Sequence, residues 1–446
     1  MNVFRLLAII VFFINPVFAQ KKAVWSTPQN DSLYMGARID DMYFFNGEIG
    51  LAFSSHTNIV KTIDSCKTWH TKMKSTNPLN TYFRSIEFSK GNKYGVVASL
   101  YGTIYRTIDS GETWSDISVN VPDTGSDKKR ICGLTHADSV FFGVGWWGST
   151  VARLYKSYDN GLNWTVDYID TTLATGLVDI MSLNDSVFLA SGTRQVGGFP
   201  RESVVLKSTD RCKTWKKVFS DTTIGGKIWK LQFLNDQIGY GSIEQYYFYD
   251  TIAYIQTKDG GENWNIHGVG SSALLSGTGR AAQGIGFINE QFGYIGGMFP
   301  GLFETTDSGK TWKHNYFGND YNRFFAIDSN LMYACGGAVY QLKLQNNSAI
   351  KKTTNSLKES RVVLHPVFPN PSSGRITIEF DLSSPENVLL EVVNLNTRTV
   401  SRVAAGYFKK GHHKYEWNGQ GLADGNYIVW LGTDTGPFIQ KFTLLK

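Results

Sequence analysis

The sequence predicts an all-β protein in which a β-propeller is followed by a small antiparallel β-sandwich. Three observations support this fold class. Aromatic residues make up 14% of the chain, Gly occurs 45 times and charged residues reach only 18%, a composition that favours strands over solvent-facing helices. One octapeptide pattern recurs six times at nearly regular intervals, and residues 361–446 have strand-like alternation of their own.

Residues 1–19 have the pattern of a secretory signal peptide. Arg5 precedes an apolar run from Leu6 to Phe13, and Ala19 supplies a small residue before the expected cleavage point. The alternative is a membrane anchor, but the run is shorter than the about 20 residues that span a bilayer. No later apolar run reaches that length, so we expect no transmembrane segment after cleavage.

The charge and the cysteines suggest neither a nucleic-acid partner nor a metal or other cofactor. The net charge of +6 is spread over short lysine and arginine pairs, and export argues against a nucleic-acid partner. The four cysteines are far apart in the sequence and form no CxxC or Cys/His cluster. We expect buried thiols without disulfides because each cysteine falls in a different repeat; they are Cys66, Cys132, Cys212 and Cys335.

The recurring pattern is Ser/Thr-x-Asp-x-Gly-x-x-Trp, and we call each copy a box. The boxes span residues 62–69, 107–114, 157–164, 208–215, 257–264 and 305–312, beginning 45 to 51 residues apart. This period suits one four-stranded propeller sheet per repeat. Residues 324–340 repeat the strand pattern without a box, and residues 23–25 could supply the missing outer strand. We therefore expect seven blades, with six as the alternative.

Each box lies between two short strand patterns and is expected to be a hairpin turn. The Asp accepts backbone hydrogen bonds, Gly tolerates positive φ, and the Trp packs beneath the turn. Cys66 and Cys212 replace the Gly, so these two turns carry strain or differ slightly in conformation. We expect twelve structural residues: Asp64, Asp109, Asp159, Asp210, Asp259, Asp307, Trp69, Trp114, Trp164, Trp215, Trp264 and Trp312.

The boxes resemble the Asp-box, or BNR, repeats of sialidases, sortilin-type receptors, xyloglucan-cleaving glycosidases and photosystem II assembly-factor propellers. The resemblance covers roughly residues 36–343. It implies a propeller domain, which we place at residues 20–343, and boxes that lie away from the ligand-binding face.

A polar linker at residues 344–360 separates the propeller from residues 361–446. The second segment contains Phe368-Pro-Asn-Pro371, alternating strands at 375–380 and 388–393, and Trp417-Asn-Gly419. It closely resembles the C-terminal sorting domain of type IX secretion cargo. The resemblance implies recognition by the type IX secretion machinery, followed by release or attachment to the outer cell surface. The alternative is a carbohydrate-binding sandwich.

His412 and His413 fall in a predicted turn of this second segment. We expect the pair to face solvent rather than to bind metal.

Propellers generally bind ligands at the face where loops enter the innermost strands. Cations fall just before these strands in five repeats, and together they would attract an anion unless they are ordinary solvated side chains. They are Arg84, Arg130, Lys227, Arg280 and Arg323. Trp146 and Trp147 lie outside the boxes, where an exposed ring would suit sugar stacking or a protein contact and a buried one would pack between blades.

Binding or scaffolding for a glycan or protein ligand is the predicted function, and a secreted glycoside hydrolase is the alternative. Asp40, Asp41, Asp179 and Glu244 are candidates for the paired carboxylates of such a hydrolase. The sialidase Arg-Ile-Pro opening and other familiar catalytic motifs are absent. The separation and accessibility of the carboxylates would distinguish the two functions.

Overall fold

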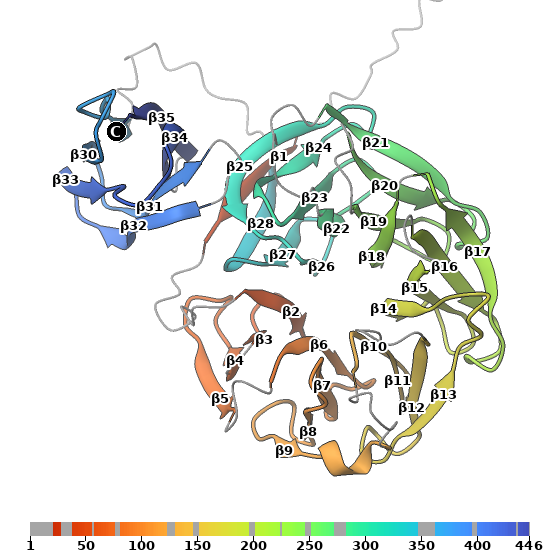
Figure 1. Cartoon of the computed structure of the whole chain (residues 1–446). Helices are drawn as coiled ribbons and strands as arrows, with labels where there is room; N and C mark the ends of the chain where they lie inside the picture. The colour runs from red at the N-terminus through yellow and green to blue at the C-terminus, as the bar shows by residue number, and fades with distance from the viewer. Residues whose placement is uncertain are drawn as a thin grey trace, which may run out of the picture.

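The structure is a computed structural model that describes 13 segments of the chain. They are residues 21–27, 38–55, 58–75, 81–122, 130–145, 151–195, 201–223, 225–245, 251–271, 282–346, 362–394, 399–433 and 436–445. Nearly all regular structure in them is β-strand, with one short 3₁₀ turn at Ser118–Asn120. The strands before residue 347 form seven four-stranded antiparallel sheets arranged around a common axis, which confirms the β-propeller (Figure 1).

The first four sheets follow one another along the chain, each running outwards from the axis. The first contains β2 (Ile39–Phe44), β3 (Gly50–Ser54), β4 (Asn58–Thr62) and β5 (His70–Lys74). The second contains β6 (Phe83–Phe88), β7 (Gly95–Ser99), β8 (Ile104–Thr107) and β9 (Ser115–Asp116). The third contains β10 (Gly133–Ala137), β11 (Val140–Gly145), β12 (Arg153–Ser157) and β13 (Thr165–Tyr168). The fourth contains β14 (Gly176–Ser182), β15 (Phe188–Arg194), β16 (Glu202–Ser208) and β17 (Lys216–Asp221).

The remaining three sheets complete the propeller. The fifth contains β18 (Gly226–Phe233), β19 (Gly239–Gln245), β20 (Thr251–Thr257) and β21 (Asn265–Ser271). The sixth contains β22 (Ala282–Phe287), β23 (Gly293–Gly297), β24 (Pro300–Thr305) and β25 (Lys313–Asn319). The seventh contains β26 (Arg323–Ala326), β27 (Leu331–Cys335), β28 (Val339–Asn346) and, from the other end of the chain, β1 (Lys21–Ser26).

The N-terminal strand supplies the outer edge of the seventh sheet, as the sequence predicts. β1 pairs antiparallel with β28, from Lys21 opposite Asn346 to Ser26 opposite Gln341. Trp25 is buried against aromatic rings of the sixth and seventh sheets. The two ends of the propeller segment are therefore joined in one sheet, which covers an edge that would otherwise be open.

Aromatic–glycine pairs at the ends of the two inner strands explain much of the glycine content. Phe44, Phe88, Phe233 and Phe287 each end an innermost strand opposite a Gly that begins the next strand. A Cβ atom at any of these Gly positions would come within about 2.4 Å of the facing ring. Only Gly leaves room for the ring to lie over the neighbouring strand.

All six boxes form the same turn between the third and fourth strands of their sheets. In each, the backbone N–H of the seventh residue donates to the Asp at 2.9 Å, and the Thr or Asn side chain of that residue donates to the other carboxylate oxygen. The first residue accepts the N–H of the fifth through its hydroxyl. The predicted roles of Ser/Thr and Asp therefore match one repeated hydrogen-bond pattern.

The two boxes with Cys in place of Gly keep this turn. Cys66 has a φ of 68° and Cys212 one of 61°, both in the left-handed region that Gly occupies in the other four boxes. Of the two alternatives left open by the sequence, the structure shows the strained one. Both side chains are buried between neighbouring sheets. Cys132 and Cys335 are also buried, and no disulfide joins any of the four, all of which lie in the described segments.

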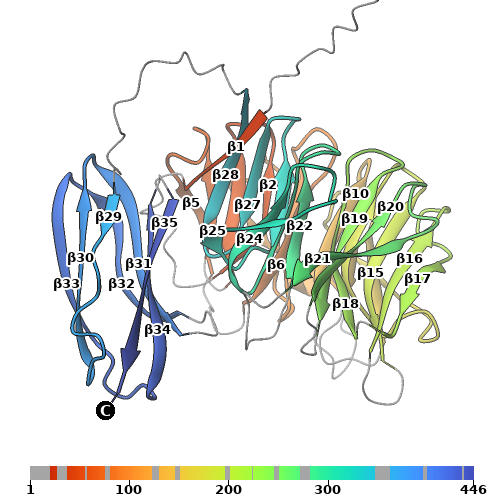
Figure 2. The ribbon, with the colours of Figure 1, turned by 90° about the horizontal axis from the view of Figure 1, so that it is seen from above.

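The C-terminal segment is an antiparallel β-sandwich. One sheet contains β29 (Val362–Leu364), β30 (Arg375–Leu382) and β33 (Gly411–Asn418). The other contains β32 (Thr399–Phe408), β31 (Glu386–Asn394), β34 (Gly425–Thr433) and β35 (Gly436–Leu444), in that spatial order. Alternate residues of the two sheets, including Phe380, Leu390 and Val429, form its core. The sandwich lies beside the propeller, with β35 near β25 (Figure 2).

Candidate functional site: the entry face and its axis cluster

The direction of the strands assigns the loops to two faces of the propeller. Because successive strands are antiparallel, the loops that enter the innermost strands share one face with the turns between second and third strands. We call this the entry face. The boxes, which lie between third and fourth strands, are on the opposite face, as the resemblance implies.

Five of the seven innermost strands carry a register shift near the entry face. The shifts occur in β2, β6, β14, β18 and β22. The residues at these irregularities include Asp40, Arg84, Trp229 and Gln283, all of which are buried. A bulge re-aims a side chain and interrupts strict alternation, so polar side chains of several sheets meet at the axis.

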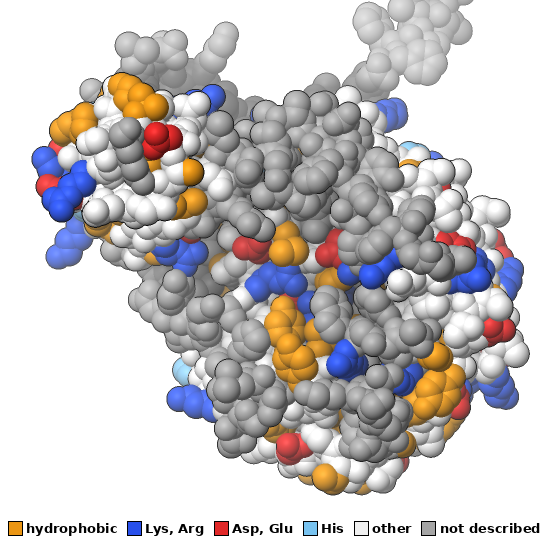
Figure 3. All heavy atoms as spheres, viewed as in Figure 1, with side chains coloured by type: hydrophobic (Ala, Val, Ile, Leu, Met, Phe, Trp, Pro, Cys, Tyr) orange, Lys and Arg blue, Asp and Glu red, His pale blue; other side chains and the backbone are white. Residues whose placement is uncertain are grey.

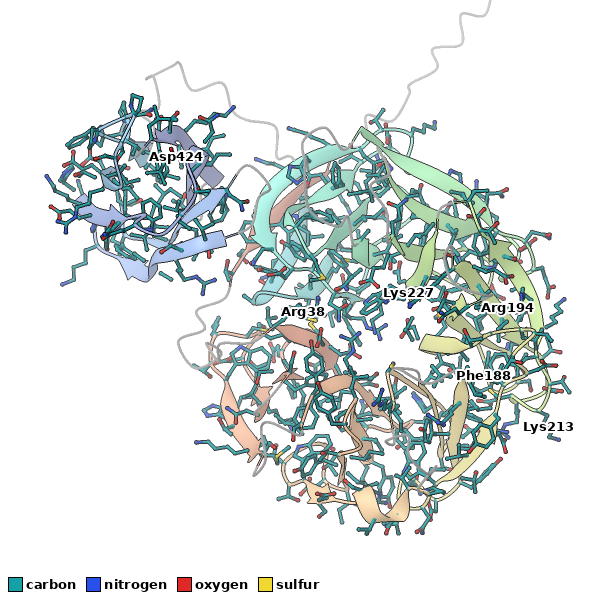
Figure 4. All side chains as sticks on the ribbon, viewed as in Figure 1. Arg38, Phe188, Arg194, Lys213, Lys227 and Asp424 are labelled. Carbon is teal, nitrogen blue, oxygen red and sulfur yellow. The ribbon has the colours of Figure 1, made fainter. Side chains whose placement is uncertain are left out.

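We call the resulting group the axis cluster. Figure 4 shows two of its members, Arg38 and Lys227, near the inner strands, while Lys213 lies at the periphery. The cluster has five cations and four carboxylates, together with three uncharged side chains. It comprises Arg38, Asp40, Asp41, Arg84, Asp179, Lys227, Trp229, Lys230, Glu244, Gln283, Asn322 and Arg323.

Asp40 connects the first, second and seventh sheets. Its Oδ1 atom lies 3.0 Å from Nη1 of Arg84, and Arg38 pairs with the same oxygen. The hydroxyl of Ser55 donates to Oδ2 at 2.9 Å, and the side-chain amide of Asn322 donates to Oδ1 at 3.1 Å. Burial alone would raise the pKa of Asp40, but the two guanidinium groups hold it below its ordinary value.

Arg323 joins opposite sides of the propeller. From the seventh sheet it donates to both oxygens of Asp41, at 2.9 and 3.3 Å, and its Nη2 atom also donates to Asp179 of the fourth sheet at 3.2 Å. Lys230 approaches the same oxygen of Asp179 at 3.4 Å. Burial would lower the pKa of Arg323, yet Asp179 and Asp41 raise it above its ordinary value. Burial and the nearby Arg323 lower the pKa of Lys230.

A second series of side-chain contacts links the fifth and sixth sheets to Arg38. Lys227 pairs with one carboxylate oxygen of Glu244, and the amide of Gln283 donates to the other at 2.6 Å. Arg38 donates in turn to the side-chain oxygen of Gln283. Arg38 therefore belongs to both groups of contacts, because it also pairs with Asp40.

Trp229 lies between two of the cations. The Cζ atom of Arg84 is 4.8 Å from its ring centroid, and the Nζ atom of Lys227 is 4.6 Å away. The indole N–H donates to the side-chain oxygen of Asn322 at 2.6 Å. Only 3% of Trp229 is exposed, and it packs with Leu100, Cys132 and Val178. An aromatic ring and paired charges thus fill the axis beneath the entry face.

The axis cluster unites two groups of residues that the sequence analysis kept apart. Arg84, Lys227 and Arg323, predicted as an anion-attracting mouth, are paired with the carboxylates predicted as catalytic candidates, Arg323 with two of them. All four candidate carboxylates, Asp40, Asp41, Asp179 and Glu244, are in the cluster and are buried. With its charges nearly balanced, the cluster is first of all a bridge between sheets.

Three other predicted site residues, Arg280, Trp146 and Trp147, fall outside the described residues. Arg130 lies on the entry side of β10, and its Nε atom has no hydrogen-bond partner among the described residues. Five further members of the axis cluster were not predicted from the sequence: Arg38, Trp229, Lys230, Gln283 and Asn322. The run from Lys227 to Lys230, two cations around a Trp at the start of a strand, is the one signal that could have indicated them.

Aromatic side chains lie at the entry face above the axis cluster. Tyr82 precedes β6 and Tyr101 is in the turn after β7; their rings meet edge to face at 6.2 Å. Tyr101 is 40% exposed. Figure 3 shows hydrophobic and basic side chains side by side around the axis. This combination of an accessible ring and nearby cations is suited to binding.

The C-terminal segment has a family match. Residues 366–444 match the model described as "Secretion system C-terminal sorting domain". The match confirms the sorting module and implies export of the chain to the cell surface or the medium. Among the described residues, no helix has the length and apolar character needed to cross a membrane.

Solved structures support the propeller fold. "YCF48 bound to D1 peptide" is 16% identical with a TM-score of 0.52 and covers 72% of this chain and 96% of that one. "YCF48 from Cyanidioschyzon merolae" is 16% identical with a TM-score of 0.53, covering 72% and 99%. "Structure of U3-55K" is 8% identical with a TM-score of 0.52, covering 72% and 98%. At these identities the likeness concerns the fold alone. No curated protein matches the chain.

Proposed function

We propose that the mature chain is a secreted or surface-attached binding module, exported through a type IX secretion system, whose entry face holds a protein ligand. The observation that carries this proposal is the exposed Tyr101 on the entry face, whose ring meets that of Tyr82. The charges at the axis are engaged with one another, whereas Tyr101 is exposed and the half-buried Arg130 has a buried Nε atom without a hydrogen-bond partner among the described residues.

A peptide segment with an acidic or carboxylate group fits this surface best. An edge-to-face tyrosine pair offers apolar ring area, and a guanidinium can bind a carboxylate through two hydrogen bonds. The similar propeller named YCF48 was solved with a D1 peptide, which supports a peptide ligand here by analogy of fold. A glycan is the other ligand class, because sugars also stack on exposed rings.

The hydrolase alternative receives less support from the geometry. Asp41 and Asp179 accept hydrogen bonds from the same nitrogen of Arg323, so their carboxylates are close enough for a glycosidase pair. Both are nevertheless buried, and both are already paired with the same guanidinium. A glycosidase needs one protonated carboxyl and access for a sugar ring at such a pair.

Ligand binding can be tested with the mature full-length chain on a peptide display library and a glycan array. We expect peptide hits, and we expect Tyr101→Ala and Arg130→Ala to weaken them by roughly tenfold each. Tyr158→Ala is the matched control, because Tyr158 is 66% exposed but belongs to a box on the opposite face. Hits confined to glycans, or equal losses from Tyr158→Ala, would contradict a peptide site on the entry face.

Export can be tested separately in a bacterium that has type IX machinery. A chain truncated before residue 362 should remain in the periplasm, while the full chain should reach the surface or the medium. Cell fractionation and protease accessibility would measure the difference. Equal appearance of both chains outside the cell would show that the sorting module is not required.

A further inference from the structure

A cluster of two histidines and one aspartate lies on the exposed side of the sorting module. His365 follows β29, Asp381 is near the end of β30, and His412 is near the start of β33. Asp381 and His412 stand directly opposite each other in the β30–β33 ladder. Two adjacent strands and the residue that follows β29 thus present ligand-type side chains at one end of the same sheet.

The side chains of this cluster already converge. One oxygen of Asp381 contacts Nε2 of His365, and the other lies 2.8 Å from Nδ1 of His412. The three ligand atoms all lie within 4.8 Å of one another. The backbone is fixed as well, since the N–H of His365 donates to the carbonyl of Glu379 at 2.9 Å. Each side chain is a third to a half exposed, so an ion from solvent can reach the cluster.

We propose that His365, Asp381 and His412 bind a divalent transition-metal ion of the zinc type. Two imidazole nitrogens and one carboxylate oxygen are a ligand set for Zn²⁺ and its neighbours, whereas Ca²⁺ and Mg²⁺ prefer oxygen ligands alone. Ligands of one Zn²⁺ stand about 3 to 3.5 Å apart, because each is about 2.0 to 2.2 Å from the ion. Small rotations of these exposed side chains reach that spacing, and water fills the remaining position.

The expected effect of the ion is to fasten the first strand of the sandwich. β29 has only three residues, and its described sheet partner is β30. A metal held by His365 on one side and by β30 and β33 on the other adds a cross-link at the end of this short strand. His412 is half exposed, as the sequence predicts, but the structure also brings it to Asp381 and His365, which are distant in sequence.

Zn²⁺ and Co²⁺ titrations of the full mature chain, purified without a polyhistidine tag, test the proposal. We expect one Zn²⁺ per chain by calorimetry, and Co²⁺ bands in the visible spectrum that Zn²⁺ abolishes. His365→Ala, His412→Ala and Asp381→Asn should each weaken Zn²⁺ binding by at least about tenfold. Zn²⁺ should also raise the unfolding temperature of the original chain but not of these variants.

His413→Gln is the matched control. His413 is the next residue along β33, but its ring packs on Phe380 and its Nε2 contacts the carbonyl of Lys409. Its substitution should leave Zn²⁺ binding unchanged. Circular dichroism in the presence of a chelator verifies that each variant is folded. Absence of Zn²⁺ binding by the original chain, or undiminished binding by the folded His365→Ala and His412→Ala variants, would overturn the proposal.

Discussion

Asp259 illustrates at the residue scale why every box contains an aspartate. Its carboxylate accepts the backbone N–H of Asn263 at 2.9 Å, the side-chain amide of the same residue at 2.8 Å and the hydroxyl of Thr257 at 2.8 Å. These hydrogen bonds, those of Asn263 foremost, lower the pKa of Asp259 from 3.8 to about 2. The other five box aspartates also have lowered pKa values. One short motif thus fixes its own turn by local hydrogen bonds.

The box carboxylates should make the propeller sensitive to acid. A carboxylate with a lowered folded pKa contributes stability that is fully present above its unfolded pKa and is lost as the pH falls through the folded value. We expect the unfolding temperature to drop between about pH 4 and pH 2 for this reason. Calorimetry across this range would measure it. A flat profile between these pH values would contradict the role of the boxes.

Asp259→Asn isolates one box. The variant should lose about 1 kcal/mol at pH 7, similar to the loss of a helix-capping side chain, and its further loss in acid should be smaller than that of the original chain. Asp236→Asn is a suitable control because Asp236 is an exposed turn residue of the same sheet. Urea denaturation at pH 7 and pH 3 would measure the free energy of unfolding of the original chain and of the two variants. Equal pH profiles for Asp259→Asn and the original chain would show that this carboxylate does not contribute.

At the scale of the element, β1 joins the two ends of the propeller. Trp25 is 8% exposed and meets Tyr294 edge to face at 5.2 Å, with Phe324 at 6.4 Å. We expect Trp25→Ala to lower the free energy of unfolding by about 3 to 5 kcal/mol, because it removes a large buried ring and leaves a cavity. Val24→Ala, on the exposed side of the same strand, should cost less than about 1 kcal/mol. Denaturant unfolding measures both, and similar losses would mean that β1 does not close the seventh sheet.

The elements were more predictable from the sequence than the site. A box is defined within eight residues by its own hydrogen bonds, and the short run Ala23-Val24-Trp25 is enough to indicate the strand that contains it. Strands and turns of this kind therefore follow from local sequence patterns. Trp229 reaches the axis through a bulge and meets Asn322, 93 positions away in the sequence. No local sequence pattern indicates the bulge, and none indicates which distant strands come into contact. The sequence therefore indicated Arg84 and Asp40 separately but not that they pair.

At the scale of the whole molecule, Arg323 holds opposite sheets together. We expect Arg323→Met to destabilise the propeller by about 3 to 5 kcal/mol, because it leaves Asp41 and Asp179 buried with too few cationic partners. Adding Asp41→Asn should restore part of this loss, since one of the uncompensated charges is removed. Lys213→Met, in the exposed part of a box, is the control and should have little effect.

Denaturant unfolding of the single and double variants would measure this coupling. If Arg323 is part of a structural bridge, the double variant is more stable than the single one, and peptide binding by the folded variants changes little. If Arg323 instead contacts ligand directly, its substitution abolishes binding while stability stays near that of the original chain. The axis cluster and the entry face can therefore be assigned separate roles by one pair of substitutions, because bridging charges act on folding and surface groups act on the ligand.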